Sequence, residues 1–107
     1  MDILSSPINK TAYATLDALQ LQQTLLAKNI ANANVSDYKP SYLNFDKALE
    51  IAKTGSSDFS SAIETKDKNV QLDLELVQMQ ETVMHYKSIL DILSRKGALM
   101  KSVLGSE

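Results

Sequence analysis

The chain contains few side chains that could carry out chemistry, and their spacing does not build a catalytic or metal site. It has a single histidine, His85, and no cysteine, so a transition-metal site would have to consist mostly of carboxylates. The serines and threonines have no base at the spacing that nucleophilic catalysis requires, and no glycine-rich phosphate loop is present. We therefore expect a protein that is not an enzyme, binds no cofactor or metal, and leaves His85 exposed or partly covered.

The composition of the 107 residues excludes further classes. Without cysteine the chain is neither a disulfide scaffold nor a zinc finger. Its 11 basic and 13 acidic residues give a net charge of −2 and form no basic cluster, so we expect no nucleic acid as partner. We also expect no small-molecule substrate. No apolar stretch approaches the roughly 20 residues that span a membrane. Asp2 and the lack of an apolar core beside it predict that no signal peptide is cleaved.

Residues 7–34 are expected to form the first of two long helices. Ser6 is a candidate N-cap, and Pro7 suits the first helical position. Residues at alternating steps of four and three predict a helix that packs one face, called here its seam, against a partner helix. The seam consists of Ala12, Leu16, Leu19, Gln23, Leu26, Ile30 and Ala33. A second row beside it contains Ala14, Ala18, Leu21 and Leu25.

Residues 69–104 are expected to form the second long helix, although 70–74 also alternate like a strand, so that the helix could begin only at Asp73. Acidic residues gather early and basic residues late, as the helix dipole favours. The seam consists of Leu72, Leu76, Met79, Val83, Tyr86, Leu90, Leu93, Gly97, Met100 and Leu104. A second row contains Ile89, Ile92, Leu99 and Val103. Gly97 on the seam predicts either close approach of another backbone or a bend.

The middle of the chain, residues 35–68, differs in character. Pro40 predicts an extended backbone after the first helix. Asn44 is a candidate N-cap for a short helix over residues 45–53, with Gly55 ending it. Residues 54–61 are rich in Ser and Thr and are expected to be a flexible linker. The expected fold class is all-α, a single domain over 1–107 in which two long helices form an antiparallel coiled-coil hairpin around a short, partly disordered middle.

The second rows leave more apolar surface than one seam can bury. Either the middle segment covers these rows in a monomeric bundle, or the rows contact other subunits. We favour contacts between subunits and expect Leu90→Asp to destabilise the monomer and Leu21→Asp to impair assembly.

Three asparagines crowd the end of the first helix, where this residue is a poor helix former. One interpretation is a fraying helix end that Asn34 caps. The other is that Asn29 and Asn32 make fixed side-chain hydrogen bonds, to the following turn or to a neighbouring subunit.

This segment resembles the amino-terminal signature of the bacterial flagellar rod, hook and filament-junction proteins. The matching residues are Lys28, Asn29, Ile30, Ala31, Asn32, Ala33 and Asn34, followed by Tyr38, Lys39 and Phe45. Residues 69–76 and 86–96 resemble the proximal rod subgroup of that family, with a sister rod protein as the other possibility. The chain departs from the family where Val35, Ser36 and Asp37 replace Thr-Pro-Gly, so the turn geometry is not carried over.

The resemblance implies a structural subunit of the flagellar basal-body rod in the periplasm. Such proteins pair their terminal helices, assemble helically, transmit torque, and leave the cell through the flagellar type III export apparatus without a cleaved leader. The implied partners are other rod proteins, the membrane ring, hook–basal-body adaptor proteins and further copies of the chain. The alternative is a soluble helical adaptor or export chaperone that binds a partner helix.

Overall fold

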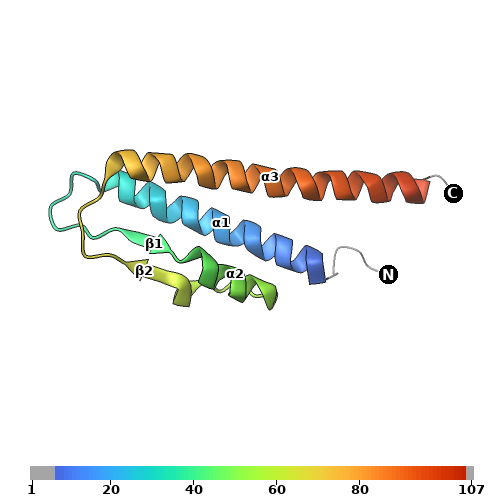
Figure 1. The fold of residues 1–107 in the computed structure, drawn as a ribbon, viewed down its shortest axis with the longest axis horizontal. Coiled ribbons are helices and arrows are strands. Elements are labelled where there is room, and N and C mark those ends of the chain that lie inside the picture. Colours follow the sequence, from blue (N-terminus) through green and yellow to red (C-terminus); the bar gives the residue numbers. More distant parts are fainter. Residues whose placement is uncertain (1–6, 106–107) are drawn as a thin grey trace.

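A computed structural model describes residues 7–105 and the side-chain environment of residues 9–97. The molecule is elongated, with extents of 63 × 24 × 16 Å. Its elements are α1 (Pro7–Ala31), β1 (Ser41–Leu43), α2 (Phe45–Lys53), the 3-10 helix η2 (Ser60–Ala62), β2 (Ile63–Thr65) and α3 (Leu72–Gly105). Figure 1 shows α3 and α1 running in opposite directions, with α1 between α3 and the middle segment.

The expected fold class is wrong, because the middle of the chain is folded and contains a sheet as well as a helix. Strands β1 and β2 pair antiparallel, with Ser41 opposite Thr65 and Leu43 opposite Ile63. The expectation failed because each strand is only three residues long, too short to show a clear alternation in the sequence. The chain therefore has three α-helices and a two-stranded sheet in its described part, rather than two helices with a disordered connection.

The expected flexible linker over residues 54–61 is also wrong. Phe59, only 3% exposed, anchors this stretch in the core. The hydroxyl of Ser57 donates to Oδ2 of Asp17 on α1 at 2.7 Å, and Oδ1 of Asp58 accepts from the Ser60 backbone N–H at 3.2 Å. The Ser-rich composition is thus used for local hydrogen bonds that shape an ordered loop.

Helix α2 begins and ends where its capping residues predict. The side chain of Asn44 accepts from the backbone N–H of Lys47 at 3.1 Å. At the other end Gly55 adopts φ +80°, and its N–H donates to the carbonyl of Ala52 at 2.8 Å. These two contacts satisfy backbone groups that a helix of nine residues would otherwise leave unpaired.

The core lies between α1 and the middle segment, not between the two long helices alone. Small side chains on α1 and α2 allow the helices to approach closely, and larger residues close the sides. The core consists of Ala14, Ala18, Leu43, Ala48, Ala52, Phe59 and Ala62, with Leu21, Leu25, Phe45 and Ile51 packed against it. The second row of α1, Ala14, Ala18, Leu21 and Leu25, is therefore covered within the chain, which corrects its assignment to contacts between subunits.

On the α1 side, the expected seam faces α3 and the interior. Leu16, Leu19 and Leu26 are buried, and Ala12, Gln23, Ile30 and Ala33 are half-buried. The helix ends at Ala31 rather than at residue 34.

On α3, the interior-facing residues match the expected seam at every second position. At the positions between them, the residue facing the interior is one earlier in the sequence than expected. Met79, Tyr86 and Leu93 are half-buried as expected, but Leu76 and Leu90 remain 45% and 43% exposed. Their places facing the interior are taken by residues one position earlier in the sequence, at steps of seven: Glu75, Thr82, Ile89 and Lys96. The apolar pattern misled here because polar Glu75 and Thr82 both find hydrogen-bond partners inside the protein.

Other expected α3 residues have mixed outcomes. Leu72 is exposed, Val83 is half-buried, and Ile92 is exposed. No atom lies within 4 Å of the position that a Cβ on Gly97 would occupy, so no other part of the described chain approaches its backbone closely. The side chains of Leu99, Met100, Val103 and Leu104 lie outside the described residues.

Candidate functional site

The segment that carries the family resemblance centres on Asn29, whose side chain is completely buried (0% exposed). Its Oδ1 accepts from the Tyr38 hydroxyl at 2.9 Å and from the Ser41 backbone N–H at 3.1 Å. Its Nδ2 donates to the Ser41 carbonyl at 2.9 Å and to Oε2 of Glu75 at 3.4 Å. The carboxamide of Asn29 thus pairs with both backbone groups of Ser41, as a neighbouring strand would, and attaches β1 to α1.

Glu75 completes this network from the first turn of α3. Its carboxylate is 2% exposed and accepts from the hydroxyl of Tyr42 as well as from Asn29. Burial, followed by the hydrogen bond and the charge of Glu75, raises the pKa of Tyr42 above its ordinary value. Burial and the same charge raise the pKa of Tyr38. Both tyrosines therefore remain protonated donors at physiological pH.

Sequence reasoning singled out Asn29 and Tyr38 but missed Tyr42 and Glu75. Tyr42 lies in a strand that the sequence does not predict. Glu75 is one of the acidic residues near the start of the second long helix, where the helix dipole alone accounts for it. A signal was nevertheless present, since Glu75 and Thr82 are seven residues apart beside the expected seam, where a polar residue is buried only if it has a partner.

The turn between α1 and β1 has the backbone geometry that Pro and Gly favour, although neither residue occupies it. The Tyr38 N–H donates to the Val35 carbonyl at 3.3 Å, and Asp37 has φ +66°. A positive φ at the third of four residues is the pattern of a type II turn, which favours Pro at the second position and Gly at the third. Ser36 and Asp37 hold those positions, so the turn is formed although Pro and Gly are absent from it.

The remaining residues of the segment 28–39 are arranged around this turn. Nδ2 of Asn32 donates to the Lys28 carbonyl at 2.8 Å, so its fixed hydrogen bond is local. Asn34 is exposed and lies beyond the end of α1, so it does not cap that helix. Ile30 and Ala33 are half-buried, Ala31 is exposed, and Lys39 pairs with Asp67 at 3.0 Å.

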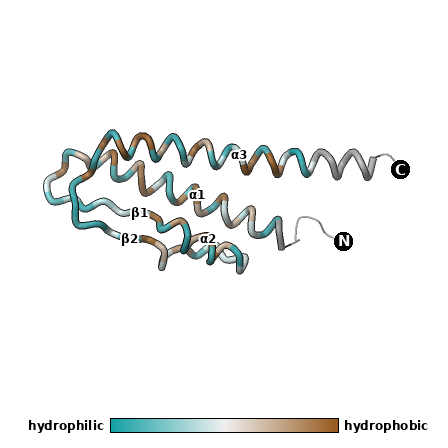
Figure 2. The backbone as a smooth tube through the Cα atoms, in the orientation of Figure 1, coloured by the Kyte–Doolittle hydropathy of each residue, from teal (hydrophilic) through white to brown (hydrophobic). Residues whose placement is uncertain are grey.

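A second candidate region is the apolar surface of α3. Most of the large hydrophobic side chains that are exposed in the described residues belong to this helix, namely Leu72, Leu74, Leu76, Val77, Met84, Leu90 and Ile92. Figure 2 shows hydrophobic positions recurring along α3 from its first turns. A surface of this kind is typical of contacts with other macromolecules.

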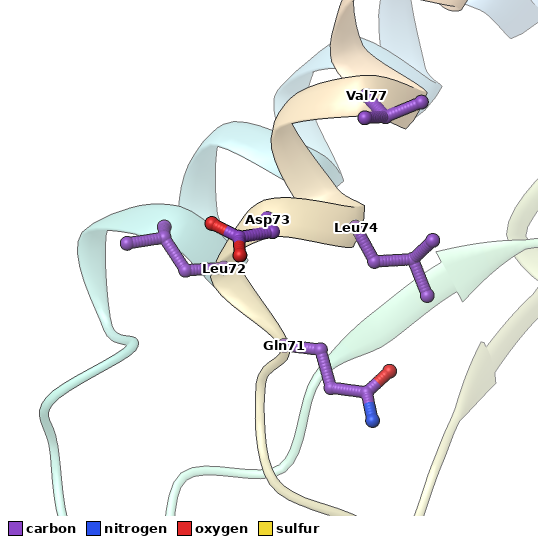
Figure 3. Close-up of a pocket in the computed structure, with 5 residues that line it drawn as sticks. All are labelled: Gln71, Leu72, Asp73, Leu74 and Val77. Atoms are coloured by element: carbon purple, nitrogen blue, oxygen red, sulfur yellow. The ribbon is translucent and has the colours of Figure 1, made fainter.

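The first turns of α3 also form a shallow hollow of about 560 Å³, lined by Gln71, Leu72, Asp73, Leu74 and Val77. Figure 3 shows Leu74 and Val77 projecting on one side of the helix and Leu72 on the other. Of the five lining residues, only Asp73 can ionise.

The described residues form no candidate metal site. They contain no group of three or more His, Asp or Glu side chains placed to hold a metal ion. His85 is exposed, and its ring centroid lies 5.6 Å from that of Phe45. No helix in the described range is long and apolar enough to cross a membrane.

No protein-family model matches the chain, and the searches of curated proteins and of solved structures found no match either.

Proposed function

We propose that this chain is a structural subunit of the bacterial flagellar basal-body rod, of the proximal rod type. In this role it assembles with other rod proteins between the membrane ring and the distal rod, transmits torque, and performs no chemistry. Export through the flagellar type III apparatus and a periplasmic location belong to the same proposal.

The turn formed by the family-like segment is the strongest support for the proposal. The residues of the family-like segment are the residues that organise the turn, with Asn29 and Tyr38 hydrogen-bonded to each other across it. Asp37, which stands where the family has Gly, adopts the positive φ that favours Gly. The resemblance therefore extends from residue types to the backbone conformation that those types would serve.

The apolar surface of α3 supports the proposal in a more general way. A subunit of a polymer needs apolar surface that remains uncovered within one chain. Over the residues whose side chains are described, α3 has seven such large side chains: Leu72, Leu74, Leu76, Val77, Met84, Leu90 and Ile92. The same surface would also suit the alternative, a helical adaptor or export chaperone that holds a partner helix.

Immunolabelling of isolated hook–basal bodies distinguishes the two functions. A rod subunit is expected in the purified basal body as a component that resists washing with salt and detergent. A chaperone or adaptor is expected in the cytoplasmic fraction and absent from the purified structure, a result that would contradict the rod proposal.

A further inference from the structure

The side of α3 that faces away from α1 carries an exposed apolar pair. Glu75 and Thr82, seven residues apart, are buried and point toward the interior. Val77 and Met84 each follow two positions later, about 200° further around the helix, and therefore lie on the opposite side. Val77 is 49% exposed and Met84 is 67% exposed. This outward face includes Leu74, which projects on the same side as Val77 in Figure 3.

Two complementary charges border the same face. Asp73 and Lys87 are exposed and form no ion pair among the described residues. They are fourteen residues apart, close to four helical turns, so they lie on one side of α3. Asp73 lies just before the Val77–Met84 stretch, and Lys87 lies just after it. A copy of the helix running in the opposite direction would therefore bring unlike charges together.

We propose that a second copy of this chain packs on this face, with the two α3 helices antiparallel. In this arrangement Met84 of each copy packs against Val77 of the other, in the hollow that Leu74 borders. Asp73 of each copy then lies near Lys87 of its partner, because the midpoint of this pair, at residue 80, nearly coincides with that of Val77 and Met84, between residues 80 and 81. A two-fold axis there makes the contact self-complementary.

The charges select the antiparallel direction. A parallel pair would place Asp73 beside Asp73 and Lys87 beside Lys87, and like charges at such positions are unfavourable. Opposed helix dipoles also favour the antiparallel pair. Methionine is suited to the central contact, because its flexible and polarisable side chain adapts to an irregular hollow.

A contact made by one helix from each copy is smaller than the roughly 800 Å² per partner of a standard interface. We therefore expect a dimer whose population rises with concentration. This closed dimer is independent of the flagellar proposal, since helical assembly requires contacts that do not close on themselves.

Sedimentation velocity of the full chain over a range of concentrations tests the proposal. The wild-type protein is expected to shift from monomer to dimer, and Met84→Glu is expected to remain monomeric with unchanged circular dichroism. Leu90→Glu, at another exposed apolar position of α3 about 120° around the helix from Met84, is the matched control and should dimerise normally. A monomeric wild type up to about 1 mM, or a Met84→Glu dimer, would overturn the proposal.

Charge reversal tests the direction of pairing. Asp73→Lys alone should weaken dimerisation by about tenfold, since two ion pairs become repulsive, and Asp73→Lys with Lys87→Asp should restore it. An unaltered dissociation constant for Asp73→Lys would contradict the arrangement.

Cross-linking supplies an independent readout, because the chain has no native cysteine. A mixture of Val77→Cys and Met84→Cys proteins should form a mixed disulfide. Met84→Cys alone should not, because the two residues at position 84 would lie about 10 Å apart along the axis. A disulfide between two Met84→Cys chains, without the mixed one, would show parallel pairing and refute the antiparallel dimer.

Discussion

At the residue scale, the side chain of Asn29 takes the place of a backbone peptide group. Its carboxamide has one acceptor and one donor group, and both contact Ser41, while Tyr38 and Glu75 use the remaining capacity. A buried network of this kind is stabilising only when every member is satisfied. In the described residues no buried side-chain polar atom lacks a partner, so the network meets that condition.

Asn29→Ala is expected to lower the free energy of unfolding by about 3 kcal/mol, because it leaves the Ser41 backbone, the Tyr38 hydroxyl and the Glu75 carboxylate without their partner. Asn34→Ala, an exposed asparagine of the same segment, should change it by less than about 0.5 kcal/mol. Urea unfolding followed by circular dichroism measures both. Equal effects of the two variants would mean that the network does not stabilise the fold.

Alkaline pH should weaken the fold through Tyr42. Its pKa is raised in the folded protein by burial and by Glu75, so the folded state retains its proton more strongly than the unfolded state does. The stabilisation is fully present below the unfolded pKa of about 10 and is lost as pH rises above it.

Tyr42→Phe provides the comparison for this pH dependence. It should be less stable than wild type at neutral pH, because Glu75 loses a donor, and the difference should shrink above about pH 10. Stability measured by urea unfolding from pH 7 to 11 tests this, and a difference that stays constant throughout would contradict it.

At the element scale, the sequence predicts where a helix begins and ends better than it predicts which side of the helix is buried. Asn44 and Gly55 mark α2 correctly because capping depends on residues next to one another in the chain. The predicted seam of α3 is wrong at Leu76 and Leu90, because the apolar spacing of leucines is the same whether their side chains face the interior or the solvent. Only the three-dimensional partners of Glu75 decide which side faces α1.

The turn at Asp37 provides a test of backbone strain. Asp37→Gly is expected to raise the free energy of unfolding by about 0.5–1 kcal/mol, because a residue with a Cβ pays to adopt φ +66°. Gly55→Ala, at φ +80° with nothing within 4 Å of the added Cβ, should lower it by about 1 kcal/mol. Thermal unfolding measures both changes, and an Asp37→Gly protein less stable than wild type would show that the aspartate side chain stabilises the turn.

The placement of Leu21 and Leu90 reverses the expectation drawn from sequence. Leu21 packs against the core formed by α1 and α2, whereas Leu90 is 43% exposed on α3. Leu21→Asp should therefore destabilise the monomer by about 2–3 kcal/mol, and Leu90→Asp by less than about 0.5 kcal/mol. Chemical unfolding of the two variants measures this. A greater loss of stability in Leu90→Asp would contradict the burial of these helices as described.

At the scale of the whole molecule, α1 is the central layer, with α3 on one side and the middle segment on the other (Figure 1). This arrangement explains why two apolar rows of α1 are both buried, while α3, packed by one side only, keeps large apolar residues exposed. The sequence predicted surplus apolar surface, but not which helix retains it, because the short strands and Phe59 that cover α1 gave no periodic signal.

Deletion of the gene tests the proposed role of this chain as a subunit of the flagellar rod most directly. Electron microscopy of basal structures from the deletion strain is expected to show the membrane ring without a rod, and the cells are expected to be non-motile. A plasmid copy of the gene should restore both. Complete rods and normal motility in the deletion strain would contradict the account.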